Sequence, residues 1–153
     1  MVNTVIANNR NGIFLFPNTG GSANVTLDRV TLANNSADGL RVQPHNNTGT
    51  GAFLVANDSV FSGNGTGVYV VTPVDSNYAV VKLFGATITG NSGVGEFADG
   101  ALVRTDVKDT EITNNGTGVS AIRGAILLSY LDNVVDRNGA GGDGAFTGSV
   151  SKR

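Results

Sequence analysis

An asparagine followed three or four residues later by a glycine recurs along this 153-residue chain and constrains its fold more than any other feature. Successive asparagines stand 26, 29, 27, 24 and 23 residues apart. A period in this range indicates a solenoid, in which each unit buries its apolar face only against neighbouring units. Stacked side-chain amides hydrogen-bond along such an axis. We therefore expect a structural ladder made of Asn9, Asn35, Asn64, Asn91, Asn115 and Asn138.

Between these asparagines, short runs of apolar residues alternate with polar ones, as in half-buried strands. One unit shows the three runs that we expect to face inward: Val30 with Leu32, Leu40 with Val42, and Leu54 with Ala56. In the last unit Ile126 and Leu128 take the third place, after a kink at Gly124. The pattern predicts an all-β, parallel β-helix of about six coils with three short strands per coil, forming one domain over residues 1–153.

The turns between strands carry further expectations. The glycine after each asparagine is expected to supply a positive φ for the bend into the next strand. Segments 17–22, 44–51 and 73–77 are rich in Asn, Gly and Pro, and we expect all three to leave the coil as loops at one corner.

Composition excludes several classes of function. Charged residues make up only 14% of the chain, and the net charge of −2 with a pI near 5.1 leaves no basic field, so we expect no nucleic-acid partner. No run of about 18 apolar residues is present, so no membrane span is expected. Residues 1–6 lack the features of a signal peptide, which predicts a cytoplasmic location for the chain as given. Because cysteine is absent, disulfides and thiol chemistry are excluded.

The chain resembles the bacterial right-handed parallel β-helix repeat proteins of the pectin-lyase-like superfamily from Ile6 to its end. Its most specific stretch, residues 129–148, is similar to the closing coil of a poorly characterised family that ends in Asn-Gly…Gly-Ala-Phe-Thr-Gly. The resemblance implies right-handed coiling and a longer parent, usually exported and therefore secreted or on the cell surface. Ile6 already stands at the position before the first repeat asparagine, so the chain begins in the middle of a repeat. We therefore expect that the N-terminal coils or cap of a longer parent are missing, or that a partner chain covers this end. An ordinary frayed terminus is the alternative.

Most catalytic motifs are missing. His45 is the one histidine and lies in a loop, where a solvated side chain is the usual outcome. No Gly-x-Ser-x-Gly elbow or phosphate-binding Gly-x-x-x-x-Gly-Lys occurs, and zinc has no second histidine or cysteine to bind it. Polygalacturonase-type hydrolysis needs clustered carboxylates, and the adjacent Asp-Asp pair of the resembled enzymes is absent.

Counting along the strands brings one polar patch together. Arg104 and Asp106 point outward with Lys108, and Lys82 is expected one coil away from Asp106. Arg104, Asp106 and Lys82 are the candidate catalytic residues. The resemblance to pectate lyases implies a reaction in which a basic residue removes the C5 proton of a uronate. The carboxylates of Asp106, Asp109, Asp99 and Asp75 are candidate ligands for Ca²⁺, a cation that prefers hard oxygen donors. Glu96, Asp99 and Asp75 are expected in loops. The competing interpretation is a solvated polar face.

Outward apolar residues form a second signal. Alternation places seven of them outside: Phe14, Phe16, Phe53, Val55, Val60, Tyr69 and Val80. They are either covered by the Pro-containing loops or exposed as a contiguous strip. An exposed strip, like the open coil ends, would serve as an interface with further coils or in a homo-oligomer.

Three hypotheses for function remain. The first is a β-helix surface module that binds carbohydrate or another small molecule, or that self-associates, without a catalytic set. The second is a calcium-assisted enzyme, either a polyuronate lyase or a hydrolase of an ester, lactone or glycoside, because calcium polarises carbonyls without a histidine. The third is a purely structural fragment.

Overall fold

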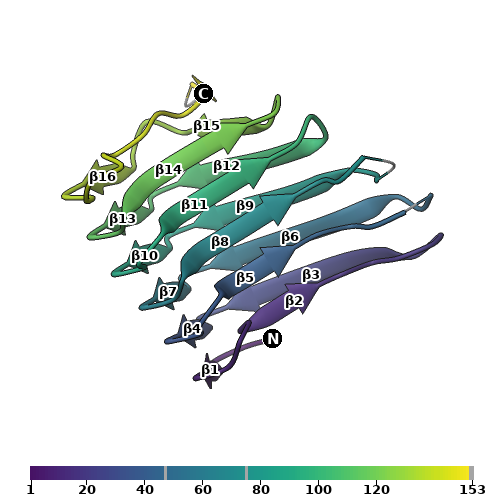
Figure 1. The fold of residues 1–153 in the computed structure, drawn as a ribbon, viewed down its shortest axis with the longest axis horizontal. Helices are drawn as coiled ribbons and strands as arrows, with labels where there is room; N and C mark the ends of the chain where they lie inside the picture. Colours follow the sequence, from purple (N-terminus) through teal and green to yellow (C-terminus); the bar gives the residue numbers. More distant parts are fainter. Residues whose placement is uncertain (47, 75, 152–153) are drawn as a thin grey trace.

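The computed structural model describes residues 1–46, 48–74 and 76–151, which form seventeen strands and no helix. Accordingly, the described part of the chain holds no helix that could cross a membrane. The strands form three parallel sheets, and each strand pairs with its counterparts one coil before and one coil after. Figure 1 shows the coils stacked from β1 to β16, with one sheet in front and another behind it. The predicted all-β parallel solenoid with three strands per coil is confirmed.

Sheet 1 and sheet 2 hold the first two strands of each coil. Sheet 1 has six strands: β1 (Val5–Ala7), β4 (Thr31–Ala33), β7 (Val60–Ser62), β10 (Thr87–Thr89), β13 (Glu111–Thr113) and β16 (Val134–Asp136). Sheet 2 has five strands: β2 (Ile13–Leu15), β5 (Asp38–Val42), β8 (Thr66–Val71), β11 (Val94–Asp99) and β14 (Thr117–Ile122).

Sheet 3 closes each coil. Its six strands are β3 (Ser22–Asp28), β6 (Gly51–Asn57), β9 (Ala79–Phe84), β12 (Val103–Lys108), β15 (Ile126–Ser129) and β17 (Gly148–Ser149). Five coils are therefore complete, and the sixth keeps only β16 and β17 among the described residues. The structure has about five coils where six were expected, because the described residues of the last coil contain no strand of sheet 2 and the glycine-rich stretch 139–144 lies outside any strand.

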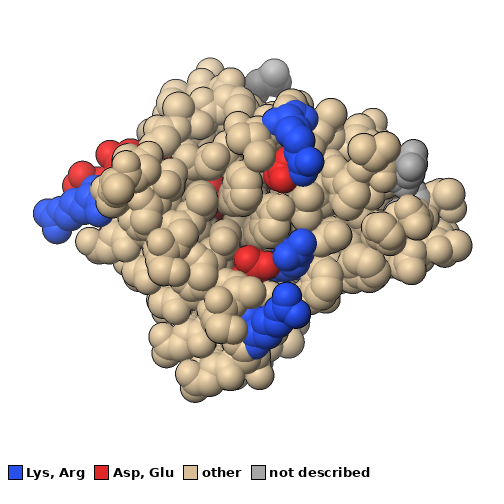
Figure 2. Space-filling model, in the orientation of Figure 1, with Lys and Arg blue, Asp and Glu red and all other residues tan. Residues whose placement is uncertain are grey.

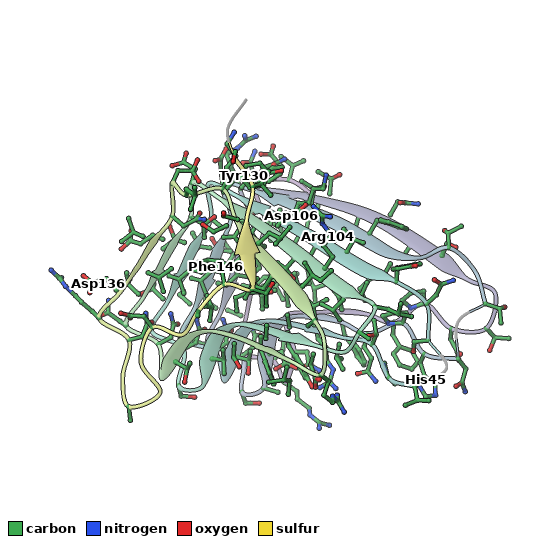
Figure 3. The ribbon with its side chains drawn as sticks, turned by 90° about the horizontal axis from the view of Figure 1, so that it is seen from above. His45, Arg104, Asp106, Tyr130, Asp136 and Phe146 are labelled. Carbon is green, nitrogen blue, oxygen red and sulfur yellow. The ribbon has the colours of Figure 1, made fainter. Side chains whose placement is uncertain are left out.

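The core is a stack of apolar residues, most of them aliphatic, inside the three sheets. Val30, Leu32, Leu40, Val42 and Phe61 are fully buried, as the alternation predicted. Figure 3 shows Phe146 of the last coil pointing into this interior, where it packs against the core.

One predicted register is wrong. Leu127 pairs with Thr105 and is fully buried, whereas Ile126 and Leu128 face outward. Three consecutive apolar residues fit either phase of a two-residue period, so alternation alone could not choose between them.

The asparagine ladder is confirmed. Asn64 shows the repeating pattern: its Oδ1 accepts from the backbone N–H and the Nδ2 of Asn35, each at 2.9 Å. Its own Nδ2 donates to Asn91 Oδ1 at 3.1 Å and to the Leu32 carbonyl at 3.0 Å. At the last rung, Asn138 donates from Nδ2 to Asp143 Oδ1 at 2.8 Å. A carboxylate only accepts hydrogen bonds when ionised, so Asp143 ends the ladder.

The glycines after the ladder asparagines serve a different purpose from the one expected. Gly67 does not have a positive φ; a Cβ there would stand 2.6 Å from the Gly95 carbonyl oxygen and 2.9 Å from Asn91 Nδ2. These glycines are required by the close approach of successive coils. The positive φ falls instead on the residue before the ladder asparagine, such as Asn34 and Gly63.

Loops leave the solenoid at one corner, as predicted. Residues 16–21, 43–50 and 72–78 all join sheet 2 to sheet 3, and the corresponding turns of the next two coils shorten to 100–102 and 123–125. The long loops sit beside one another, since the backbone N–H of His45 donates to the Pro17 carbonyl and Ser76 Oγ donates to the Pro44 carbonyl.

Candidate ligand-binding face

A row of aromatic and guanidinium side chains crosses the outer face of sheet 2. Its members stand two residues after the repeat glycine of each coil and lie in register from coil to coil: Phe14, Arg41, Tyr69 and Phe97. Ser120 holds the same position in the next coil. Neighbouring strands are about 4.8 Å apart, which is close to a ring-stacking distance. The repeat therefore places flat groups directly over one another.

The row is stacked. The Arg41 guanidinium carbon lies 4.9 Å from the centroid of the Tyr69 ring and 5.5 Å from that of the Phe14 ring. The Tyr69 and Phe97 rings are 5.0 Å apart and nearly parallel, at 9°. Cation–π and ring–ring contacts of this kind hold side chains in fixed positions. The face thus presents an ordered surface rather than separate mobile side chains.

Arg41 is also held by polar contacts within its own coil. Its Nε donates to Gln43 Oε1 at 2.8 Å, and its Nη1 pairs with Asp38 Oδ2 at 3.3 Å. Burial raises the pKa of the Asp38 carboxyl, and the positive charge of Arg41 opposes that rise. Burying a carboxylate is tolerated only when it is paired, so Asp38 and Arg41 depend on each other.

A second pair closes the other end of the row. Arg123 makes a bidentate ion pair with Asp99 of the preceding coil, and Tyr69 Oη donates to Asp99 Oδ2 at 3.4 Å. Burial, and after it the negative charge of Asp99, raises the pKa of Tyr69. The hydrogen bonds to Asp99 raise the pKa of Arg123. Tyr69 is therefore a hydroxyl donor at neutral pH, and Arg123 is a cation.

Most of the charges on this face are paired. Arg41 and Arg123 are matched by Asp38 and Asp99, and the exposed Arg10 is one further cation near Asp38. Figure 2, which views the molecule from the side of sheet 2, shows a few places where acidic and basic groups adjoin on a largely uncharged surface. Such a surface suits a neutral ligand.

Aromatic side chains extend the face toward the loops. Phe16 lies 5.2 Å from Phe14 between ring centroids, tilted by 57°, and the imidazole of His45 stacks on Phe16 at 5.5 Å. His45 is half-buried by this contact, where a freely solvated side chain was expected. The Phe14 side chain is 47% exposed, so a ligand has access to this end of the row.

The predicted catalytic residues lie on a different face. Arg104, Asp106 and Lys82 do come together on sheet 3, with Asp106 in register with Lys82. Arg104 Nε and Nη2 donate to the two oxygens of Asp106 at 2.9 and 3.3 Å. Figure 3 shows Arg104 and Asp106 on the sheet 3 side and His45 far from them at the loop corner. Asp106 is buried beneath these contacts.

The three predicted calcium ligands that the structure describes lie on different parts of the coil. Asp106 is on sheet 3, Asp109 follows at the corner before β13, and Asp99 ends β11 on sheet 2. Asp75 lies outside the described residues. Nowhere in residues 1–46, 48–74 and 76–151 do three acidic or histidine side chains gather as a metal site would require. Asp106, Asp109 and Asp99 therefore do not form one cluster.

Two of the acidic residues were expected in loops and are not there. Glu96 and Asp99 both belong to β11. Glu96 occupies an inward position between Val68 and Val119 and is fully buried, with no hydrogen-bond partner for either carboxyl oxygen among the described residues. Burial raises the pKa of Glu96 to about 8, and the nearby Thr105 hydroxyl lowers it by less. Glu96 is a neutral core residue at neutral pH.

The predicted outward apolar residues do face outward, but on separate faces. Phe14 and Tyr69 are on sheet 2, Phe53, Val55 and Val80 on sheet 3, and Val60 on sheet 1, while Phe16 starts a loop. They form no single strip, because one coil turns the same alternation toward three directions. The two aromatic residues of this set that lie on sheet 2, Phe14 and Tyr69, belong to the stacked row.

A groove adjoins the row at its Arg123 end. It has a volume of about 310 Å³ and lies at the loop corner. Its lining is mostly apolar and consists of Thr72, Pro73, Val74, Ser76, Gly100, Ala101, Leu102 and Arg123. Arg123 therefore belongs both to the charged end of the row and to the groove.

Sequence reasoning missed Arg41, Phe97 and Arg123 as site residues. The signal for the first two was present, because both stand two residues after a repeat glycine, as Phe14 and Tyr69 do. Arg123 had no such signal, since its pairing with Asp99 joins residues 24 positions apart in a turn outside the alternation.

Comparison with known proteins adds no family: no family model, no curated protein and no solved structure matches this chain. The parallel β-solenoid rests on the structure itself. The pectin-lyase-like kinship stays a prediction from sequence resemblance.

Proposed function

We propose that this protein is a carbohydrate-binding β-solenoid module whose ligand lies along the row on sheet 2. The single observation that supports this most is the continuous stack Phe14–Arg41–Tyr69–Phe97, whose arginine is neutralised by Asp38. Sugar rings have apolar C–H groups and hydroxyl rims, so they can pack against the outward edges of the stacked rings and hydrogen-bond to fixed planar polar groups. Rigid apolar surface with a few placed polar groups is what ligand sites offer.

The pairing of Arg41 and Arg123 with aspartates limits the charge of the ligand that this face would bind. A polyuronate would bring one carboxylate per unit to a face that already holds Asp38 and Asp99, and the arginines beside them are already paired. A neutral oligosaccharide loses no charge solvation on binding. We infer a neutral glycan, several units long, running across the coils. Right-handed coiling, pectin-lyase-like kinship and export of the parent protein are parts of the same proposal and rest on the sequence resemblance.

The test is a glycan array followed by calorimetric titration of the glycans that bind. The variant Tyr69→Ala should weaken binding about tenfold, because it removes the middle ring of the stack. A matched control on the opposite side is Phe53→Ala, whose exposed ring lies on sheet 3. Loss of binding in the control but not in Tyr69→Ala would refute the placement, and absence of any bound glycan would refute the function.

A calcium-assisted lyase remains as a second candidate, on one observation. Arg104, Asp106 and Lys82 share the outer face of sheet 3, where a basic residue adjoins a carboxylate. Its test is release of unsaturated product from polygalacturonate, lost in Asp106→Ala and in the presence of chelator. Unchanged turnover in both conditions would remove this candidate.

A further inference from the structure

We propose that the glycan face includes a specificity subsite for an acetylated sugar, built from the side of Phe97 that faces Ser120, and from Arg123 with its groove. This inference rests on the proposed function, because it assigns one unit of the bound glycan. An acetamido group and an O-acetyl ester share the chemistry required, a carbonyl acceptor with a terminal methyl.

The stack of rings stops at Phe97. Phe97 stacks on Tyr69 on the side of the third coil, and its partner on the fifth coil is Ser120. A serine side chain extends too little to cover a phenyl ring, so the second side of Phe97 has space for a flat group. A sugar ring placed there would continue the stack at the level where the fifth coil has no ring.

Polar groups beside this space fix an orientation. Along the strands, Asp99 and Ile122 come two residues after Phe97 and Ser120, in register with each other. Two residues of strand span about 7 Å, roughly the width of a sugar ring with one substituent. Ile122 is 42% exposed and adds an apolar flank. A ring on Phe97 therefore directs one substituent toward Arg123.

Arg123 has donors to offer that substituent. Its Nε and Nη2 bind Asp99, and its side chain is 64% exposed. A guanidinium carries five N–H donors and no acceptor, so the remaining donors favour an acceptor such as a carbonyl oxygen. Asp99 is held by Arg123 and Tyr69 and keeps the guanidinium in place.

Beyond Arg123 the surroundings turn apolar. Pro73, Ala101 and Leu102 line the groove next to the guanidinium. A substituent that ends in a hydroxyl or an ammonium would lose solvation there, whereas a methyl group would gain from burial. From Phe97 through Arg123 to the groove, the site would therefore bind a sugar ring, then a carbonyl oxygen, then a methyl group. An acetylated sugar carries these three groups in this order.

Calorimetric titration with chitotriose, cellotriose and the glucosamine trimer tests the inference, with an O-acetylated xylotriose as a fourth probe. The wild type should bind one or both acetylated trimers about tenfold more tightly than cellotriose. Preference for chitotriose alone would identify the acetamide, and preference for the xylotriose the ester. Equal affinity for all probes would overturn the subsite and leave the proposed function standing, whereas no binding of any glycan would remove the function itself.

Ser120→Phe should fill the space above Phe97 and lower chitotriose affinity about tenfold, while Ser120→Ala should change it less than about twofold. Both substitutions are on the outer face, so circular dichroism should show an unchanged fold. Full binding by Ser120→Phe would place the ligand elsewhere. Leu102→Asp, which puts a charge in the groove, should reduce only the preference over cellotriose; an unchanged preference would exclude the groove.

Discussion

The guanidinium of Arg41 lies between the rings of Phe14 and Tyr69, its carbon 5.5 and 4.9 Å from their centroids, while its Nη1 reaches the buried Asp38. One side chain therefore links three coils on the outside of the solenoid. The same contact orders the proposed binding row and neutralises a carboxylate. Stability and ligand binding consequently share this residue.

Arg41→Leu should lower the free energy of unfolding by about 2 kcal/mol, because Asp38 loses its cation while remaining buried. Urea denaturation measures the loss. The double variant Arg41→Leu with Asp38→Asn should recover part of it, since no unpaired charge remains. Equal losses in the single and double variants would show that the ion pair is not the cause.

Interior and terminal rungs of the ladder should differ. Asn64→Ala should cost about 3 kcal/mol, because Asn64 both accepts from Asn35 and donates to Asn91 in a buried position. Asn9→Ala should cost less than about 1 kcal/mol, since its Nδ2 donates only to the nearby Ala7 carbonyl at an exposed site. Thermal unfolding compares the two. Similar costs at both positions would contradict a cooperative ladder.

Glycine substitutions separate close approach from backbone conformation. Gly67→Ala should destabilise by more than about 2 kcal/mol, because its Cβ would clash with the Gly95 carbonyl although φ is ordinary. A Cβ added at Gly142, where φ is +71°, would meet no other atom within 4 Å. Gly142→Ala should therefore cost only about 1 kcal/mol, from the left-handed backbone alone. Denaturation midpoints should rank the pair in this order; the reverse order would contradict the stated role of Gly67.

Glu96 should make stability depend on pH. Its carboxyl is neutral in the fold up to about pH 8 but ionises near 4.5 in the unfolded chain, so over that interval the folded state holds the extra proton. The free energy of unfolding should therefore fall by about 1.4 kcal/mol per pH unit between these values and level off above.

Glu96→Gln should lack this slope, because an amide does not titrate. Urea unfolding of the wild type and the variant at about pH 5, 6, 7 and 8 gives both slopes. A wild-type stability that stays level, or follows the same course as the Gln variant, would show that Glu96 is not the titrating group.

The repeat predicted most of the fold because its physics is local and periodic. An asparagine per coil, alternation on each strand and turn residues at the corners led directly to the ladder and to buried positions such as Leu32 and Leu40. Prediction from the repeat failed where the periodicity does not distinguish between two structures. Ile126, Leu127 and Leu128 fit both phases, and the final glycine-rich turns do not distinguish a strand from a cap formed by Asp143.

The candidate site was less accessible from sequence. Phe14 and Tyr69 were recognised as outward residues, and the same spacing from the repeat glycine extends the row to Arg41 and Phe97. The ion pair between Asp99 and Arg123 joins two coils through long side chains, and the spacing of residues in the sequence does not predict such a contact. Among the described candidates for calcium binding, Asp99 is separated from Asp106 because the chain turns from sheet 2 to sheet 3 between them.

The most direct measurement of the central claim is mapping of backbone amide shifts by NMR during titration with a neutral oligosaccharide that binds. Binding along the row predicts shifts concentrated in β5, β8 and β11, strongest around Arg41, Tyr69 and Phe97, with β6, β9 and β12 unchanged. Shifts confined to sheet 3, or no shifts at saturating glycan, would contradict a carbohydrate site on sheet 2.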